Sequence, residues 1–160
     1  ENTNADALDV DFSNGKILNS TFNNSINDSV DFSGSNVLLD NVKIFYAGDK
    51  AISVGEQSKI NISNSYIQSS HFGIVAKDKS IVEGNNITLT NNDVAIAAYI
   101  KKSEYGTLLS DVIFCSSTKF GSDAIATMQS LNEPMKSDEN KVHFKMIYFE
   151  NDMYVIQKLI

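Results

Sequence analysis

The sequence predicts one all-β domain that winds as a parallel β-solenoid with about 22 residues in each coil. Two observations carry this prediction: apolar residues recur at a spacing of 22, and asparagines recur at one position of each repeat. Composition agrees, because Asn and Ser together supply 38 of the 160 residues, and both compete with helical hydrogen bonds. A helical bundle is therefore disfavoured.

The first strand of each coil is indicated by small and apolar residues. Small residues recur every 22 positions, at Ala7, Ser29, Ala51, Gly73 and Ala95. The residues directly after them are Leu8, Val30, Ile52, Ile74 and Ile96, and two positions further on are Val10, Phe32, Val54, Ala76 and Ala98. Apolar residues two apart, with polar residues between them, are typical of a short strand with one buried face. Five such segments in register predict five stacked strands.

Each repeat holds two further short strands. The second repeat has Val37 and Leu39, followed by Val42 and Ile44, and the later repeats follow the same pattern. Three strands within 22 residues are too short to close a hairpin sheet. They fit one turn of a parallel solenoid, in which each coil stacks on the next at about 4.8 Å.

Asparagine marks the corner between the second and third strands. The corner residues are Asn19, Asn41, Asn64, Asn86 and then Asp111, at spacings of 22, 23, 22 and 25. Asparagine tolerates left-handed backbone dihedrals, and a stacked amide satisfies both its donor and its acceptor. The pattern predicts a ladder of stacked amides that solvent does not reach.

The repeat becomes irregular after Ala98. We expect a protruding loop at Tyr99 to Gly106, a fifth set of strands at Leu109, Val112 and Phe114, and a weaker sixth coil near Ala124. The stretch 130–140 contains the single proline and is expected to be a loop. We therefore assign residues 1–128 to the coils and 129–160 to a C-terminal cap of the same domain, because a solenoid must cover its terminal edge.

Charge and cysteine content limit the possible partners. The net charge is −7 and no arginine is present, which argues against nucleic acid or an anionic membrane as the main partner. No apolar run is as long as a membrane span, so membrane insertion is not expected. Cys115 is alone, so no intrachain disulfide forms, and its apolar neighbours predict a buried thiol. The polar start at Glu1 shows no signal peptide and runs straight into the repeat, so we expect an upstream part that this chain lacks.

Several segments resemble a known family. Among them are AGDKAISVGE, GIVAKDKSIV and KKSEYG, and together the similar segments span about residues 7 to 114. They resemble the right-handed parallel β-helix region of bacterial proteins that are associated with CotH-like kinase domains, within the pectate-lyase-like superfamily. The resemblance implies a single-stranded, right-handed β-helix, a bacterial origin and a secreted or cell-envelope setting. It also implies that an upstream β-helix or kinase-like domain belongs to the same polypeptide.

The resemblance also indicates where a site would lie. In pectate-lyase-like proteins, the first strand of each coil and the loop before it form the carbohydrate-binding face. The outward column of that strand here is Asp9, Asp31, Ser53, Val75 and Ala97, and the next outward column is Asp11, Ser33, Gly55, Lys77 and Tyr99. Two close carboxylates, Asp9 and Asp31, are the usual pair for acid–base work on a glycosidic bond. A calcium site formed by Asp9, Asp11, Asp28 and Asp31 is a second possibility, and a solvated acidic face is a third.

The loop before the first strand provides a second candidate. Its column contains Asn27, Asp49, His71 and Asp93. Asp49 and Asp93 flank His71 in this column, and a carboxylate of either can orient the imidazole for general-base work; the alternative is an ordinary surface histidine. Many lyases of the superfamily use an arginine, which is absent here, so Lys50 or Lys77 would have to replace it.

Function is only partly indicated by these features. We expect a non-catalytic binding or scaffold module of a bacterial extracellular or envelope protein that contacts polysaccharide, with no organic cofactor and calcium as the one candidate ion. Enzymatic activity stays open, as a polysaccharide lyase, hydrolase or epimerase that uses the acidic face. A structural fibre or stalk segment is the remaining alternative.

Overall fold

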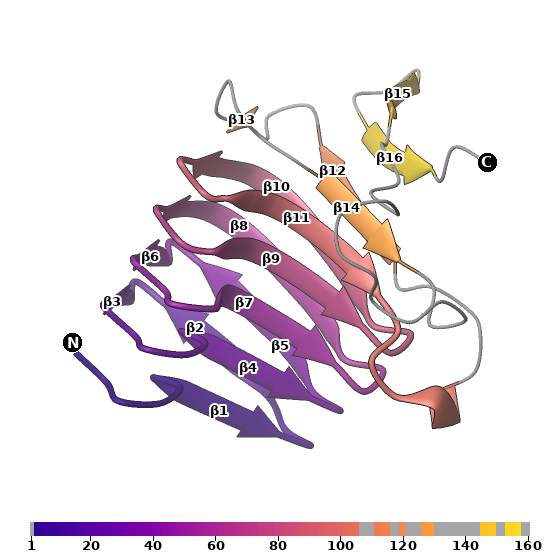
Figure 1. The fold of residues 1–160 in the computed structure, drawn as a ribbon. Coiled ribbons are helices and arrows are strands. Elements are labelled where there is room, and N and C mark those ends of the chain that lie inside the picture. Colours follow the sequence, from indigo (N-terminus) through magenta and orange to yellow (C-terminus); the bar gives the residue numbers. More distant parts are fainter. Residues whose placement is uncertain are drawn as a thin grey trace.

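The chain winds into a stack of coils, as the spacing of 22 predicts. The computed structural model describes residues 2–105 and, beyond them, residues 111–115, 119–120, 126–129, 145–149 and 153–157. Figure 1 shows the coils following one another in sequence order from the N-terminal end, with two sheets on opposite sides of the stack. The predicted all-β parallel solenoid is confirmed.

Within the described residues, one side of the solenoid is a six-stranded parallel sheet. Its strands are, in spatial order, β1 (Leu8–Asp11), β4 (Val30–Ser33), β7 (Lys50–Gly55), β9 (Phe72–Lys77), β11 (Val94–Tyr99) and β14 (Ala126–Gln129). The register aligns Leu8, Val30, Ile52, Ile74 and Ile96 in one row. The repeat in the sequence is therefore the repeat of the sheet.

The other side contains the second and third strands of the coils. They are β2 (Asn14–Leu18), β3 (Thr21–Asn23), β5 (Asn36–Asp40), β6 (Lys43–Phe45), β8 (Lys59–Gln68), β10 (Ile81–Thr90), β12 (Asp111–Cys115) and β13 (Lys119–Phe120). The first two coils have two separate strands here, as predicted. The third and fourth coils instead have one ten-residue strand each, β8 and β10, which bends at Asn64 and Asn86. The ladder between β8 and β10 resumes directly after these asparagines, so the corner occupies a single residue.

Each coil turns at three corners, and every corner has a residue with a left-handed backbone, with φ between 45° and 63°. The first column of corners is Asn2, Asn24, Tyr46, Ser69 and Asn91, the second is Phe12, Gly34, Glu56 and Asp78, and the third is Asn19, Asn41, Asn64 and Asn86. Only the third column shares one residue type. Left-handed dihedrals are unfavourable for most side chains, so the other corners must be held by their tertiary contacts.

The predicted asparagine ladder is present, but it lies on the outside of its corner. Asn41 Nδ2 donates to Asn19 Oδ1 at 2.8 Å, and Asn86 Nδ2 donates to Asn64 Oδ1 at 2.9 Å. Asn64 Nδ2 donates to Asp40 Oδ1, so the two amide pairs are not joined. All four asparagines are exposed, so the prediction of inaccessible amides is wrong. The sharp corner turns these side chains outward, toward water.

Buried serines close the corners from the inside, a feature that the asparagine pattern does not reveal. Ser35 Oγ accepts the N–H of Ser13 at 3.0 Å, and Ser58 Oγ accepts the N–H of Ser35 at 3.0 Å. Ser65 Oγ accepts the N–H of Val42 at 3.1 Å. In each case the hydroxyl belongs to the following coil. Ser58 and Ser65 donate in turn to a carbonyl of their own corner, whereas Ser35 Oγ lies 2.9 Å from Val10 O of the preceding coil and 3.1 Å from Ser33 O. A corner N–H without such a partner would be a buried unpaired donor, which costs about 1–3 kcal/mol.

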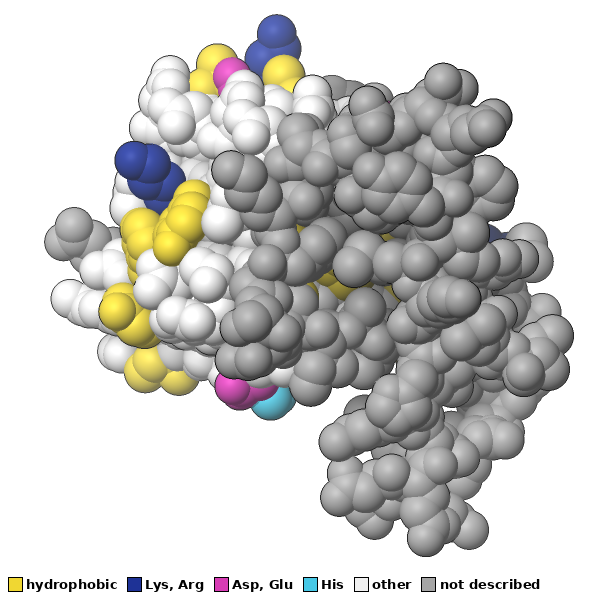
Figure 2. Space-filling model, turned by 90° about the horizontal axis from the view of Figure 1, so that it is seen from above, with side chains coloured by type: hydrophobic (Ala, Val, Ile, Leu, Met, Phe, Trp, Pro, Cys, Tyr) yellow, Lys and Arg dark blue, Asp and Glu magenta, His cyan; other side chains and the backbone are white. Residues whose placement is uncertain are grey.

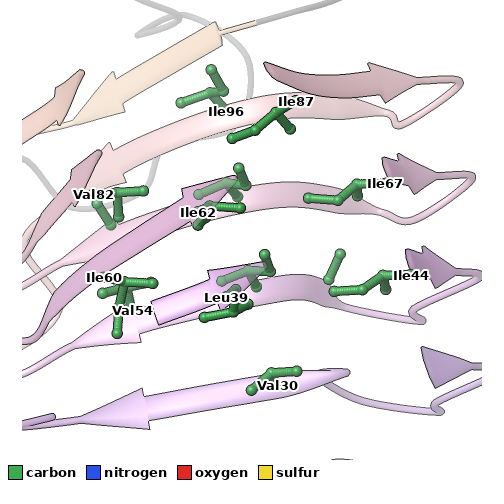
Figure 3. Close-up of a cluster of buried hydrophobic side chains, with 14 of the residues drawn as sticks. Val30, Leu39, Ile44, Val54, Ile60, Ile62, Ile67, Val82, Ile87 and Ile96 are labelled. Atoms are coloured by element: carbon green, nitrogen blue, oxygen red, sulfur yellow. The ribbon is translucent and has the colours of Figure 1, made fainter. Parts of the chain in front are cut away.

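The core is a column of aliphatic side chains between the two sheets. Figure 3 shows Val30, Leu39, Ile44, Ile62, Ile67, Ile87 and Ile96 among its members, stacked coil upon coil. The side chains of Val30, Leu39 and Ile44 are fully buried. Burying one such side chain contributes about 1.5–3 kcal/mol, so the column is the main source of stability.

The C-terminal edge of the second sheet is paired by an antiparallel hairpin. β16 (Met153–Gln157) pairs with β12, and β15 (Lys145–Phe149) pairs with β16. These strands fall in the segment that the sequence assigns to the cap. The boundary at residue 128, the sixth coil near Ala124, the loop at 130–140 and the side chain of Cys115 lie outside what the structure describes, and they stay predictions.

The loop predicted after Ala98 begins at the end of β11 and contains a short 3₁₀ helix, η1 (Ser103–Tyr105). Gly106, its predicted last residue, lies outside the described part of the chain. No helix among the described residues is long and apolar enough to cross a membrane.

Candidate functional site

The predicted outward column of the first sheet is in register. Asp9, Asp31, Ser53, Val75 and Ala97 align on successive strands. The column is not a uniformly solvated face, however, because Ser53 and Val75 are 0% exposed and Ala97 is 1% exposed. Only its first members, on β1 and β4, contact water. Polar groups further along this face are therefore in a buried environment.

Asp31 forms an ion pair with Lys77 two coils away. Lys77 Nζ lies 3.7 Å from Asp31 Oδ1, and the side chains are 6% and 25% exposed respectively. The lysine stem passes over Gly55, where a Cβ would lie 3.3 Å from Lys77 Cε. Burial lowers the pKa of Lys77, and the nearby Asp31 carboxylate offsets this only in part. The structure thus brings together two of the predicted catalytic residues as a largely buried pair.

Two further ion pairs lie one column away, between Lys50 at the start of β7 and carboxylates in the loops before β4 and β7. Lys50 Nζ contacts Asp49 Oδ2 and lies 3.4 Å from Asp28 Oδ1, and Asp28 Oδ1 also accepts the N–H of Lys50 at 2.9 Å. Burial raises the pKa of Asp28, and the charge of Lys50 opposes that rise. Burial alone would lower the pKa of Lys50, but the bond to Asp49 and the charge of Asp28 outweigh it, and the pKa is raised. The lysine is therefore charged at neutral pH.

Tyr99, at the end of β11, completes this charged face. It belongs to the predicted second outward column, and its register partner on β9 is Lys77. Burial raises the pKa of Tyr99 to about 12, and the positive charge of Lys50 opposes that rise. A phenol that stays protonated at every ordinary pH is a hydrogen-bond donor and not a base here.

The ionisation of Tyr99 provides a test of this arrangement. Its pKa of about 12 in the folded state lies above the ordinary 10.0, so its contribution to stability is complete below pH 10 and is lost as the pH rises toward 12. We expect the phenolate absorbance of the parent, minus that of Tyr99→Phe, to titrate with a midpoint near pH 12. As the pH rises from 10 toward 12, the urea midpoint of the Tyr99→Phe variant should fall less steeply than that of the parent. A difference curve with a midpoint near 10 would show that Tyr99 is not buried as described.

His71 pairs with Asp93 and not with Asp49. His71 Nδ1 lies 2.8 Å from Asp93 Oδ2, and the side chains are 51% and 73% exposed. Asp49 is engaged by Lys50 instead. The rings of His71 and Phe72 are packed in a T-shaped arrangement, with the ring centroids 4.5 Å apart. Figure 2 shows imidazole and carboxylate side chains next to each other at the surface. A carboxylate does orient this imidazole, but the pair is open to water.

The predicted cation ligands do not gather. Asp9 and Asp11 are exposed at the N-terminal end of the face, Asp28 bonds to Lys50, and Asp31 pairs with Lys77. Burial raises the pKa of Asp9, and the neighbouring Asp11 and Asp31 carboxylates raise it further. Among the residues that the structure describes, no three side chains of His, Cys, Asp or Glu come together in a way that could hold a metal ion. The calcium site stays a prediction, without an arrangement that supports it.

Three of the acidic side chains on this face are engaged by lysines. Asp28, Asp31 and Asp49 all have lysine partners. Ser53 Oγ, which lies between Asp31 and Val75 in the column, is buried with no hydrogen-bond partner in the described part of the chain. Sequence reasoning found these side chains but not their pairing, since Lys77 reaches Asp31 across an intervening coil.

The protein is a parallel β-solenoid, because its coils of about 22 residues are stacked and turn at three corners. Its outer face carries ion pairs. A family model described as "Right handed beta helix region" matches residues 1–143, and the chain belongs to this family. The right-handed winding implied by the resemblance is thereby established. No curated protein and no solved structure matched the chain.

Proposed function

We propose that this chain is a non-catalytic binding and scaffold module of a bacterial extracellular or envelope protein, and that it contacts polysaccharide. The resemblance of the AGDKAISVGE and KKSEYG segments to exported bacterial β-helix proteins supports the setting. The stacked, fully buried core supports the scaffold role, because a solenoid of this kind holds its surface columns at a constant spacing.

The observation that carries the non-catalytic part is the pairing of the acidic groups. Catalysis on a glycosidic bond needs a carboxylate or base that is free to exchange a proton and is held against the substrate. Asp49 contacts Lys50, Asp31 faces the ammonium of Lys77 at 3.7 Å, and Lys77 itself is 6% exposed. An enzymatic role for Asp31, Asp49 or Lys77 would first require these ion pairs to break.

Contact with sugar is supported by the exposed end of the same face. Phe12 follows β1 directly and is 78% exposed. Its ring covers Gly34, where a Cβ would lie 2.6 Å from Phe12 Cδ1. Asp9 and Asp11 are exposed beside it. A flat aromatic surface with nearby hydrogen-bond acceptors suits one or two sugar rings, and such a small surface favours weak binding, with a Kd of about 1 mM.

The test is a screen of neutral and acidic polysaccharides for turnover and for binding. We expect no new reducing ends and no unsaturated products from the parent, and weak binding that Phe12→Ala removes. Lys16→Ala, an exposed change on β2, is the matched control and should keep the binding. Turnover by the parent that disappears in Asp9→Asn and in Asp9→Asn/Asp31→Asn would establish the enzyme alternative. Absence of any glycan binding would leave only the scaffold role.

A further inference from the structure

We propose that a single buried water molecule binds between Asp31, Ser53 and Lys77 on the outward side of the first sheet and bridges all three side chains. This inference goes beyond the proposed function, because it concerns the inside of the charged face and does not depend on contact with sugar. Three sets of observations carry it: two buried oxygen atoms without a partner, an ion pair too long for a direct hydrogen bond, and the neighbours that enclose the site.

Two oxygen atoms at this position are buried without a hydrogen bond. Ser53 Oγ and Asp31 Oδ1 are both buried, and neither has a partner in the described part of the chain. They lie on neighbouring strands, because Asp31 on β4 is the register partner of Ser53 on β7. Buried polar atoms almost always have a hydrogen-bond partner, and ordered water supplies it where the protein does not.

The ammonium of Lys77 is the third polar group at this position. Lys77 Nζ lies 3.7 Å from Asp31 Oδ1, whereas a direct N–H···O bond spans about 2.7–3.2 Å. The lysine side chain is only 6% exposed, so bulk solvent cannot satisfy its ammonium fully. Polar groups more than about 3.5 Å apart are often joined through a water molecule. The distance within the ion pair therefore indicates a bridge and not a direct contact.

The charges and the packing around the site select the occupant. Lys77 is positive and Asp31 is negative, so neither an anion nor a cation gains a net attraction between them. The occupant has to accept from the ammonium and donate to the carboxylate, which requires a group with both functions. Val75, the other register partner of Ser53, is 0% exposed, and the lysine stem passes over Gly55. Anything larger than water would have to displace these packed groups.

A water molecule here makes one hydrogen bond to each of the three side chains. It accepts from Lys77 Nζ and donates its two hydrogens to Asp31 Oδ1 and Ser53 Oγ. Three hydrogen bonds are typical of a buried water. The bridge gives both buried oxygens a partner and links the two charges across the 3.7 Å gap.

The direct test is a crystal structure of this chain at a resolution that shows ordered water. We expect one water molecule within about 2.6–3.2 Å of Lys77 Nζ, Asp31 Oδ1 and Ser53 Oγ. A direct bond between Lys77 and Asp31 that leaves Ser53 Oγ unpaired would overturn the proposal. Electron density that only a larger or charged ligand explains would overturn it as well.

Ser53→Ala tests the same bridge in solution. If the hydroxyl binds the water, its removal takes away one hydrogen bond, and the urea midpoint should fall. If the hydroxyl is unpaired, its removal relieves a desolvation penalty, so a midpoint that rises or stays the same would overturn the proposal.

The matched control is the same substitution in an Asp31→Leu/Lys77→Met background, which lacks the other two partners of the water. There Ser53→Ala should not lower the midpoint, because the hydroxyl no longer belongs to a bridge. An equal fall in both backgrounds would show that Ser53 contributes by packing alone, and would overturn the proposal.

Discussion

Replacing Gly73 by alanine is expected to lower the free energy of unfolding by about 2–3 kcal/mol, or to prevent folding. Gly73 is buried in β9, and a Cβ at this position would lie 2.5 Å from the carbonyl oxygen of Ala95 and 2.6 Å from Leu89 Cδ2. The carbonyl belongs to the next coil and is held by the stack, so it cannot move without shifting β11. For a chain of this size the loss corresponds to a fall in Tm of roughly 4–12 °C.

Gly15 is the matched control for this substitution. It lies on exposed β2, and a Cβ there would have nothing within 4 Å. Alanine restricts the unfolded chain more than glycine does, so Gly15→Ala should leave stability unchanged or raise it by up to about 1 kcal/mol. Urea unfolding of the two variants measures the difference directly. Equal midpoints would mean that β9 and β11 are not packed as closely as described.

The second large effect is expected at the ion pair of the outer face. Lys77→Met keeps the side chain as far as Cε but leaves the Asp31 carboxylate without its partner, and Asp31→Asn leaves the Lys77 ammonium unpaired at 6% exposure. Breaking a fully buried pair costs about 3–5 kcal/mol. Because Asp31 is 25% exposed, we expect each single variant to lose a smaller amount, about 2–3 kcal/mol.

The double variant distinguishes pairing from packing. Asp31→Asn/Lys77→Met should lose less stability than the sum of the two single changes, with a coupling energy of about 1–3 kcal/mol. Lys102 offers a comparison, since it contacts Glu56 but is 40% exposed. Lys102→Met should leave the urea midpoint nearly unchanged, because water screens such a pair. Additive effects at positions 31 and 77 would show that the two side chains do not interact.

These stability effects bear on the choice between module and enzyme. If the Asp31–Lys77 pair is strongly coupled, both side chains serve the stack, and neither is free for proton transfer. The same cycle therefore supports or weakens the non-catalytic proposal independently of any glycan. The exposed His71–Asp93 pair is a further acid–base arrangement that a substrate could reach without rearrangement.

The spacing of residues along the chain was enough to predict the solenoid, its coil length and the rows of its first sheet. Small and apolar residues at intervals of 22 leave no other way to bury one face of every strand, which is why Leu8, Val30 and Ile52 align as predicted. The third corner could also be predicted, because asparagine is the residue that best tolerates its left-handed backbone. Membership of the outward column, from Asp9 to Ala97, follows from the same alternation.

Only the tertiary structure decided which of those outward residues interact. Lys77 passes over Gly55 to reach Asp31, and Lys50 takes Asp49 away from His71. Long side chains choose partners by burial and by the geometry of neighbouring coils, and neither is visible in a spacing. The exposed position of the asparagines and the buried acceptors Ser35 and Ser58 were decided in the same way. The inner and outer sides of a corner are defined only once the coils are stacked. Stacking also decides which corner N–H groups have no carbonyl of a neighbouring strand to bond to and so need a serine hydroxyl.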